Sequence, residues 1–366
     1  MDLPLLMPRS RIMLFAPHPD DESLATGIYL QRAINAGASV RVVYATDGER
    51  NCWPQRVLER KLRLCEKDRR RWGARRRKEA LAALGVLGIS ANDVRFLSFP
   101  DQGITDLLLS GCGETLRRLA EAIADWRPTH LLVPSQHDTH PDHSGLAVLL
   151  RLTLQNHFAA RSRLTSLHYL VHGTSESFLL HSRAIAPRPP EESAKAKAIL
   201  CHATQVALSR RRFLAYARRP ERFIIGDETA TVPLFDGPIR ALVRSREGLR
   251  LDVSFPLKPL RAETASLYLV GRDLFGDVTR LRATLPGRTN RISLLDCASG
   301  DVAAIGSYRG DAFRAEISLP LPSLATSAPL YVKLDRRIWF FDEAGWVEVP
   351  PLPLTQAVPF SELAVA

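Results

Sequence analysis

Residues 11–22 read RIMLFAPHPDDE, a short apolar run that stops at a histidine and a group of acidic residues. Uninterrupted apolar runs of this length are typical of strands buried on both faces of a parallel sheet. A helical pattern begins directly after the acidic group, so the polar residues occupy a strand-to-helix turn. Because ligands of open α/β sheets bind at the carboxyl ends of the strands, this turn is the first candidate for a functional site.

Outward from this stretch, strand-like and helix-like segments alternate through the first 220 or so residues. Such alternation predicts an α/β domain with a mostly parallel sheet and helices on both faces. The predicted strands are 11–16, 39–46, 93–99, 129–134 and 166–172. The predicted helices are 22–36, 55–87 with a break at Gly73, 113–126, 141–157 and 193–217.

The pattern changes near residue 237, where apolar and polar residues begin to alternate, as at Leu249, Leu251 and Val253. Period-2 runs separated by turn residues indicate an antiparallel sandwich or barrel. We therefore expect an α/β domain over 1–225, a smaller all-β, sandwich-like domain over 237–350, and a loose Pro-rich tail over 351–366.

The charge balance is strongly basic, with 50 Lys and Arg against 39 Asp and Glu and a net charge of +11. This surplus favours an anionic partner such as a phosphorylated glycan or an acidic membrane face, although a solvated basic surface is an equal alternative. The basic runs 69–71 and 75–78 lack interleaved aromatics apart from Trp72, so no specific nucleic-acid binding is expected. Phosphate or membrane contacts, suited to a phosphorylated or lipid-linked sugar, are the favoured use of these runs, and the sequence carries no signal of oligomeric state.

Five scattered cysteines without a CxxC pair indicate a reducing compartment. The first residues do not resemble a secretory signal, and no apolar run reaches the roughly 18 residues of a membrane span. A cytoplasmic location is therefore expected.

A second polar motif, residues 137–143, follows the predicted strand 129–134 and reads HDTHPDH. Zinc binds imidazole nitrogen and carboxylate oxygen, and catalytic zinc sites keep one position open for water. We expect His18, Asp21 and His143 to converge on one Zn²⁺ ion. Either motif alone is as well explained as a helix-capping loop, whereas two such motifs at strand ends of one domain favour a metal site.

The residues next to the expected ligands suggest a hydrolytic mechanism. Asp20 adjoins a ligand without binding the metal itself, so it is the candidate general base for an activated water. His140 lies one helical turn before His143 and is expected to stabilise the oxyanion or to protonate the leaving amine. Asp142 is expected to orient a ligand imidazole.

Together the two motifs resemble those of the PIG-L/LmbE family of zinc deacetylases, with Pro17 as an extra residue in the first. Weaker similarities, such as residues 46–49, 99–103 and 197–205, follow in family order, so the resemblance covers roughly 10–225. It implies a Rossmann-like fold and removal of an N-acetyl group from a GlcNAc-type sugar conjugate, including phosphorylated or lipid-linked envelope glycans. It also implies substrate contacts for Arg76 and Asp101; a solvated helix face and a turn cap are the respective alternatives.

Two other classes of function are considered. A nucleotide-sugar glycosyltransferase or dinucleotide oxidoreductase would need a Gly-rich phosphate loop after the first strand, where this chain has an acidic turn. A non-catalytic glycan-binding protein would not need the intact set of ligands and base. Metal analysis discriminates among the three classes, because only the hydrolase needs about one zinc ion per chain.

Overall fold

The computed structural model of the 366-residue chain describes residues 3–157, 164–173, 176–226, 237–254, 265–285, 290–311, 313–335 and 340–352. The described residues form two compact units. The first comprises residues 1–237 and 336–347, and the second comprises 238–335 and 348–366. Residues 353–366 of the predicted tail lie outside the described residues.

The first unit is built on a seven-stranded sheet with the strand order β3-β2-β1-β4-β5-β7-β6. Its first five strands in this order are parallel, and β7 and β6 add an antiparallel edge. The strands are β1 (Arg11–Ala16), β2 (Ser39–Thr46), β3 (Val94–Phe99), β4 (His130–Pro134), β5 (Thr165–Tyr169), β6 (Arg183–Ile185) and β7 (Glu221–Ile225). The apolar residues of β1 are fully buried, as expected for a central parallel strand.

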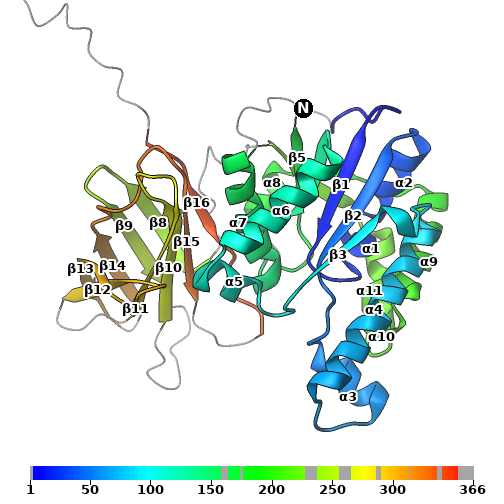
Figure 1. Ribbon diagram of the computed structural model, residues 1–366, viewed down its shortest axis with the longest axis horizontal. Helices are drawn as coiled ribbons and strands as arrows, with labels where there is room; N and C mark the ends of the chain where they lie inside the picture. The colour runs from blue at the N-terminus through cyan, green and yellow to red at the C-terminus, as the bar shows by residue number, and fades with distance from the viewer. Residues whose placement is uncertain are drawn as a thin grey trace, which may run out of the picture. The chain divides into compact units, whose positions relative to one another are not determined.

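Helices cover both faces of this sheet (Figure 1). One group packs around α9, and another group packs around α7. The helices are α1 (Asp21–Ala25), α2 (Gly27–Asn35), α3 (Cys52–Glu59), α4 (Glu66–Val86), α5 (Ile104–Ser110), α6 (Gly113–Trp126), α7 (Pro141–His157), α8 (Glu176–His181), α9 (Pro189–Cys201), α10 (Ala203–Val206) and α11 (Arg210–Arg218). The predicted α/β class with helices on both faces is confirmed.

The long predicted helix 55–87 is two helices, and its predicted break at Gly73 is wrong. The chain leaves α3 at Arg60, which adopts a left-handed conformation with φ 53°, and re-enters a helix at Glu66. A capping contact from the Cys65 N–H to the Asp68 carboxylate, 3.1 Å long, starts α4. Gly73 lies inside α4, where the missing side chain lets the helix pack closely against Asp47 and Glu49. The predicted helix 193–217 is likewise divided, into α9, α10 and α11.

The second unit is a nine-stranded antiparallel sheet with the order β16-β15-β10-β11-β12-β13-β14-β9-β8. The predicted all-β class of this region is confirmed. Its strands are β8 (Ile239–Arg244), β9 (Leu249–Ser254), β10 (Ala265–Arg272), β11 (Val278–Leu285), β12 (Arg291–Asp296), β13 (Val302–Gly310), β14 (Arg314–Leu319), β15 (Leu330–Asp335) and β16 (Val347–Val349). The alternating residues Leu249, Leu251 and Val253 all point into its core.

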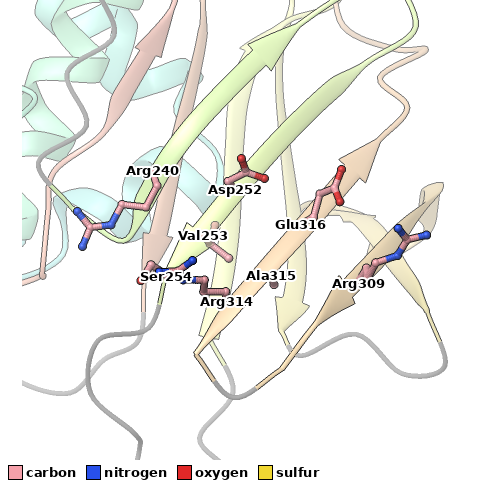
Figure 2. A pocket seen from close by; sticks show the side chains of 8 residues that line it. All are labelled: Arg240, Asp252, Val253, Ser254, Arg309, Arg314, Ala315 and Glu316. Carbon is pink, nitrogen blue, oxygen red and sulfur yellow. The ribbon is translucent and has the colours of Figure 1, made fainter.

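An open hollow of this unit lies over β8, β9, β13 and β14 (Figure 2). Arginines and carboxylates both line it, so it favours no ligand of a single charge. The lining residues are Arg240, Asp252, Val253, Ser254, Arg309, Arg314, Ala315 and Glu316.

Residues 336–347 group with the first unit, although the sequence pattern places them inside a β domain of 237–350. Within the described ranges, none of the helices combines the length and apolar character that crossing a bilayer requires.

Candidate active site

Two loops meet at one edge of the first unit's sheet because β1 and β4 are parallel neighbours. The loop after β1 carries His18 and leads into α1, whose first residue is Asp21. The loop after β4 leads into α7, which begins at Pro141, a residue suited to the first helical position, and carries His143 in its first turn. The topology therefore brings together two motifs that lie more than a hundred residues apart in the sequence.

Three donor atoms lie close together at this edge. His18 Nδ1 is 3.2 Å from His143 Nε2 and 3.4 Å from Asp21 Oδ2, and His143 Nε2 is 3.2 Å from Asp21 Oδ2. Ligand atoms bound tetrahedrally to one zinc ion at about 2.0–2.1 Å lie about 3.3 Å apart. The three side chains, all buried, thus fit a divalent metal of this size without rearrangement.

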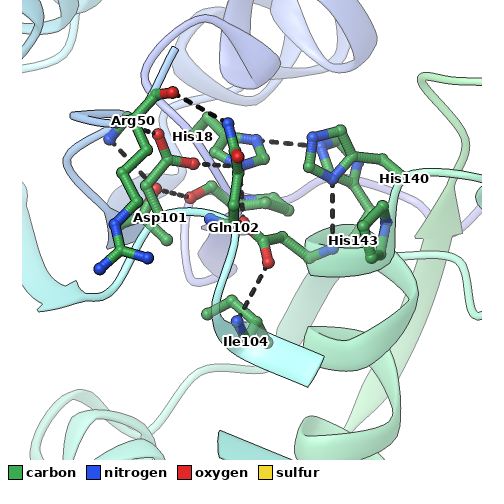
Figure 3. A network of polar contacts seen from close by, with 12 residues as sticks. His18, Arg50, Asp101, Gln102, Ile104, His140 and His143 are labelled. Carbon is green, nitrogen blue, oxygen red and sulfur yellow. Dashed lines mark hydrogen bonds and ion pairs between the residues drawn. The ribbon is translucent and has the colours of Figure 1, made fainter. Parts of the chain in front are cut away.

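Carboxylates lie beside the outer nitrogens of both imidazoles, and Figure 3 shows Asp101 next to His18. His18 Nε2 lies 3.2 Å from Asp142 Oδ2 and 3.3 Å from Asp101 Oδ1, and His143 Nδ1 lies 3.1 Å from Asp138 Oδ2. Such partners fix the ring orientation and the tautomer of a ligand histidine. The sequence pattern assigned no role to Asp138, although its position within the second motif was a usable signal.

These carboxylates also change the acid–base properties of the histidines. Burial lowers the pKa of His143, but the charges of Asp21 and Asp138 outweigh burial and raise the pKa to about 9. The pKa of His18 is raised in the same way, since hydrogen bonds to Asp101, Asp142 and Asp21 overcome desolvation. The buried cluster is rich in negative charge and therefore favours a bound cation.

Backbone N–H groups hold Asp142 and Asp101 in place, and Figure 3 shows the contact between Arg50 and Asp101. Asp142 accepts hydrogen bonds from the N–H groups of Gln102 and Ile104, at 2.6 and 3.0 Å. Asp101 accepts one from the N–H of Arg50, at 2.6 Å. Asp101 was predicted to contact substrate, and its carboxylate faces His18 in the structure; a substrate contact stays a prediction.

Asp20 occupies a strained position at the start of α1, with φ 139°. Its N–H donates to Glu22 Oε2 at 2.9 Å, which holds the turn in this conformation. Burial raises the pKa of the Asp20 carboxyl to about 6, against the opposing charge of Arg76. A carboxylate with this pKa can accept and return a proton near neutral pH.

Arg76 is 3% exposed, which excludes the alternative of a solvated helix face. Its guanidinium donates to the carbonyl oxygens of Pro19 and Gly48, at 2.6 and 2.9 Å, and lies 3.4 Å from Asp20 Oδ1. Arg76 therefore joins the loops after β1 and β2 and faces the carboxylate of Asp20. Its predicted substrate contact stays a prediction.

His140 is neutral and its tautomer is defined by one hydrogen bond. Burial lowers its pKa well below the ordinary value, and the neighbouring His18 and His143 lower it further. The Asp142 N–H donates to His140 Nδ1 at 3.1 Å, so Nδ1 is an acceptor and the ring proton lies on Nε2. His140 can therefore donate a hydrogen bond through Nε2 without carrying a charge.

Two further histidines belong to this region and were not predicted as site residues. His172 follows β5, and its ring lies 4.8 Å from that of His143 and 5.3 Å from that of His140. His172 is the last residue of the predicted strand 166–172, so the strand-end rule that identified the two motifs could have found it. His202 Nε2 lies 2.7 Å from Glu22 Oε1, so His202 supports the turn at Asp20 indirectly. The run 197–205 that contains His202 resembles the family, but a packed or capping histidine was the favoured interpretation.

Comparison with known proteins links this site to deacetylases. Residues 13–153 match the PIG-L family, described as GlcNAc-PI de-N-acetylase. A 1D-myo-inositol 2-acetamido-2-deoxy-alpha-D-glucopyranoside deacetylase of Mycobacterium sp. (strain KMS) is 33% identical over 148 residues, covering 36% of this chain and 46% of the relative. A protein of the same description from Mycolicibacterium vanbaalenii is 30% identical over 206 residues, covering 51% of this chain and 67% of the relative.

The chain spans about half the length of the first of these relatives. Among solved structures, N,N'-diacetylchitobiose deacetylase from Pyrococcus horikoshii is similar with a TM-score of 0.46 and 20% identity, covering 59% of this chain and 84% of that one.

Proposed function

Because the chain belongs to the PIG-L family of GlcNAc-PI de-N-acetylases, we propose that it is a zinc-dependent amide hydrolase that removes the N-acetyl group of a GlcNAc-type sugar conjugate. The observation that carries this proposal is the triangle of donor atoms of His18, Asp21 and His143, with sides of 3.2–3.4 Å. A site of three protein ligands leaves a position for water and is typical of hydrolytic zinc enzymes.

His18, Asp21 and His143 would hold the ion, and Asp138, Asp142 and Asp101 would orient the two imidazoles. When bound, zinc supplies Lewis acidity, which lowers the pKa of a water molecule and polarises the amide carbonyl. The remaining steps belong to the side chains around it.

Asp20 acts as the general base. Its carboxylate accepts a proton from the attacking water while the water oxygen forms a bond to the amide carbon. His140 Nε2–H donates a hydrogen bond to the developing oxyanion, a role that its neutral tautomer supports. Asp20 then returns the proton to the nitrogen as the C–N bond breaks, which yields acetate and the free amino sugar. His140 as the proton donor is less favoured, because it carries one ring proton and no charge.

We also propose that the substrate is anionic or attached to a membrane. The helix α3 and the residues after it form an exposed apolar surface, in which Trp53 is 72% and Leu62 is 91% exposed. Four exposed basic residues lie close to them in the sequence: Arg56, Arg60, Lys61 and Arg63. In Figure 1, α3 projects from the lower end of its unit, beyond α4. Tryptophan and leucine flanked by basic residues are typical of surfaces that bind anionic lipid interfaces.

Co-sedimentation with lipid vesicles tests this surface. The protein should sediment with phosphatidylcholine vesicles containing phosphatidylglycerol and much less with phosphatidylcholine alone. The Trp53→Ser/Leu62→Ser double variant should lose most of the binding, while Leu274→Ser, which removes another exposed leucine in the second unit, should not. Equal sedimentation of all three proteins would contradict the proposed surface.

A cytoplasmic location is proposed as well, since all five cysteines are free thiols.

Metal analysis combined with an acetate-release assay tests the function. The purified chain should contain about one zinc ion and should release acetate from N-acetylhexosamine conjugates in a chelator-sensitive manner. Asp21→Ala should lose both properties, because it removes one corner of the triangle. A folded wild-type protein that binds no zinc would refute the proposal.

A further inference from the structure

Residues 340–346 form a segment of the first unit that contacts the loop leading to His140. The N–H of Asp342 donates to the carbonyl oxygen of Thr139 at 2.8 Å, and the N–H of Trp346 donates to that of Gln136 at 2.7 Å. Gly345 permits this approach, because a Cβ atom there would lie only 1.9 Å from the Gln136 carbonyl oxygen. The segment is therefore held against the backbone of the second motif.

Two aromatic rings of this segment face the histidines of the site. The Phe340 ring centroid lies 5.0 Å from that of His140 at an interplanar angle of 79°. The Phe341 ring lies 5.6 Å from His140 and 5.2 Å from His172. The two phenylalanine rings also contact each other edge to face, with centroids 5.0 Å apart. Together they form an aromatic pair beside His140.

The burial of these side chains distinguishes a binding role from a packing role. Trp346 is completely buried and anchors the segment, whereas Phe340 is 44% exposed and Phe341 is partly exposed. An aromatic ring that serves only the core is normally well buried. The aromatic pair thus keeps apolar surface accessible beside the imidazole that is proposed to meet the reacting carbonyl.

We propose that Phe340 and Phe341 form an aromatic subsite that binds the C–H surface of the substrate next to the scissile amide. This inference rests on the proposed function. The family match ends at residue 153, so the match assigns no role to Phe340 or Phe341. Two parts of the substrate offer this chemistry: the alkyl chain of the acyl group and the C–H face of the sugar ring. Aromatic side chains bind either through apolar burial and contact with the ring face.

Steady-state kinetics of Phe340→Ala and Phe341→Ala, both loaded with zinc, test the subsite. One series of substrates keeps glucosamine and varies the acyl group from acetyl to propionyl and butyryl. The other series keeps acetyl and compares N-acetylglucosamine with the open-chain N-acetylglucosaminitol, which lacks the ring. Phe275→Ala is the matched control, because Phe275 is 93% exposed and belongs to the second unit.

We expect kcat/KM of each Phe variant to fall about tenfold, mainly through KM, as for loss of an apolar contact in a specificity pocket. If the acyl chain is bound, the loss grows with chain length. If the sugar ring is bound, the loss appears for N-acetylglucosamine and is absent for the open-chain substrate. Wild-type kcat/KM for both variants on every substrate would overturn the subsite, even if the enzyme is an active deacetylase.

A binding measurement separates failure of the subsite from failure of the proposed function. Calorimetry of N-acetylglucosamine with zinc-loaded Asp20→Asn reports binding without turnover, and adding Phe341→Ala should weaken this binding about tenfold. If the wild-type protein hydrolyses no amide, weaker binding of N-acetylglucosamine after Phe341→Ala still supports the subsite. Binding that is unchanged by Phe341→Ala, or absent from the start, refutes it. Should Phe341→Ala fail to fold, Phe341→Leu removes the aromatic face with a smaller change in volume, and the same criteria apply.

Discussion

Two regions contact His140 from different parts of the chain. The loop after β1 places the His18 ring 4.7 Å from that of His140, and the segment 340–346 places the Phe340 ring 5.0 Å from it. The first region consists of buried charged groups in a dense network of hydrogen bonds and ion pairs. The second presents partly exposed apolar rings. The difference suggests that one region carries the chemistry and the other contributes recognition.

The largest effect should come from removing the base in the first region. Asp20→Asn should lower kcat by roughly 100-fold to 10,000-fold, because it removes the proton acceptor, while zinc content stays near one per chain. Asparagine suits this position because it tolerates positive φ better than most residues. Stopped or continuous acetate assays together with metal analysis measure both quantities. A variant with wild-type turnover would show that another group takes the proton.

A smaller effect is expected at the carboxylate behind His143. Asp138→Asn should weaken zinc affinity by about 10-fold to 100-fold, as is typical when the partner of a ligand histidine is removed. Asp142→Asn should weaken zinc affinity less, because His18 Nε2 also contacts Asp101, at 3.3 Å. Titration against a chelator of known affinity ranks the two variants. The reverse ranking would contradict the assigned partners.

The smallest of the three effects should arise in the second region. Gly345→Ala should lower kcat/KM by about tenfold, because its Cβ would displace the segment from Gln136 and misplace the aromatic pair. Zinc affinity should stay unchanged, which distinguishes this region from the first. Gly85→Ala is the control, since a Cβ at Gly85 meets no atom within 4 Å. Loss of zinc in Gly345→Ala would show that the two regions are not separable.

Much of the fold could be predicted from local patterns. Buried parallel strands appear as short apolar runs, so their positions and the α/β class followed from the sequence. The division of 55–87 into two helices could not, because neither Gly nor Pro marks Arg60, and the break depends on a capping contact to Asp68. The antiparallel edge strands β6 and β7 were also missed, because they are only three and five residues long and carry no strong apolar pattern.

For the candidate site, too, some residues could be predicted from the sequence and others could not. His18, Asp21 and His143 could be proposed because each lies next to the end of a parallel strand, where topology alone brings side chains together. The roles proposed for them and for Asp20 and His140 stay predictions for metal analysis and kinetics. Asp138 and His172 could have been found by applying the same strand-end rule to every predicted strand. The role of His202 could not, because it depends on a contact with Glu22 across 180 residues of sequence.

By itself, then, the sequence determined the two strand-end motifs and the resemblance that they carry, since both depend on residues close together along the chain. Only the tertiary structure decided which carboxylate faces which imidazole, which tautomer His140 adopts, and that residues 340–346 return to the first unit. Those features depend on contacts between segments far apart in sequence, and no local periodicity or propensity encodes such contacts.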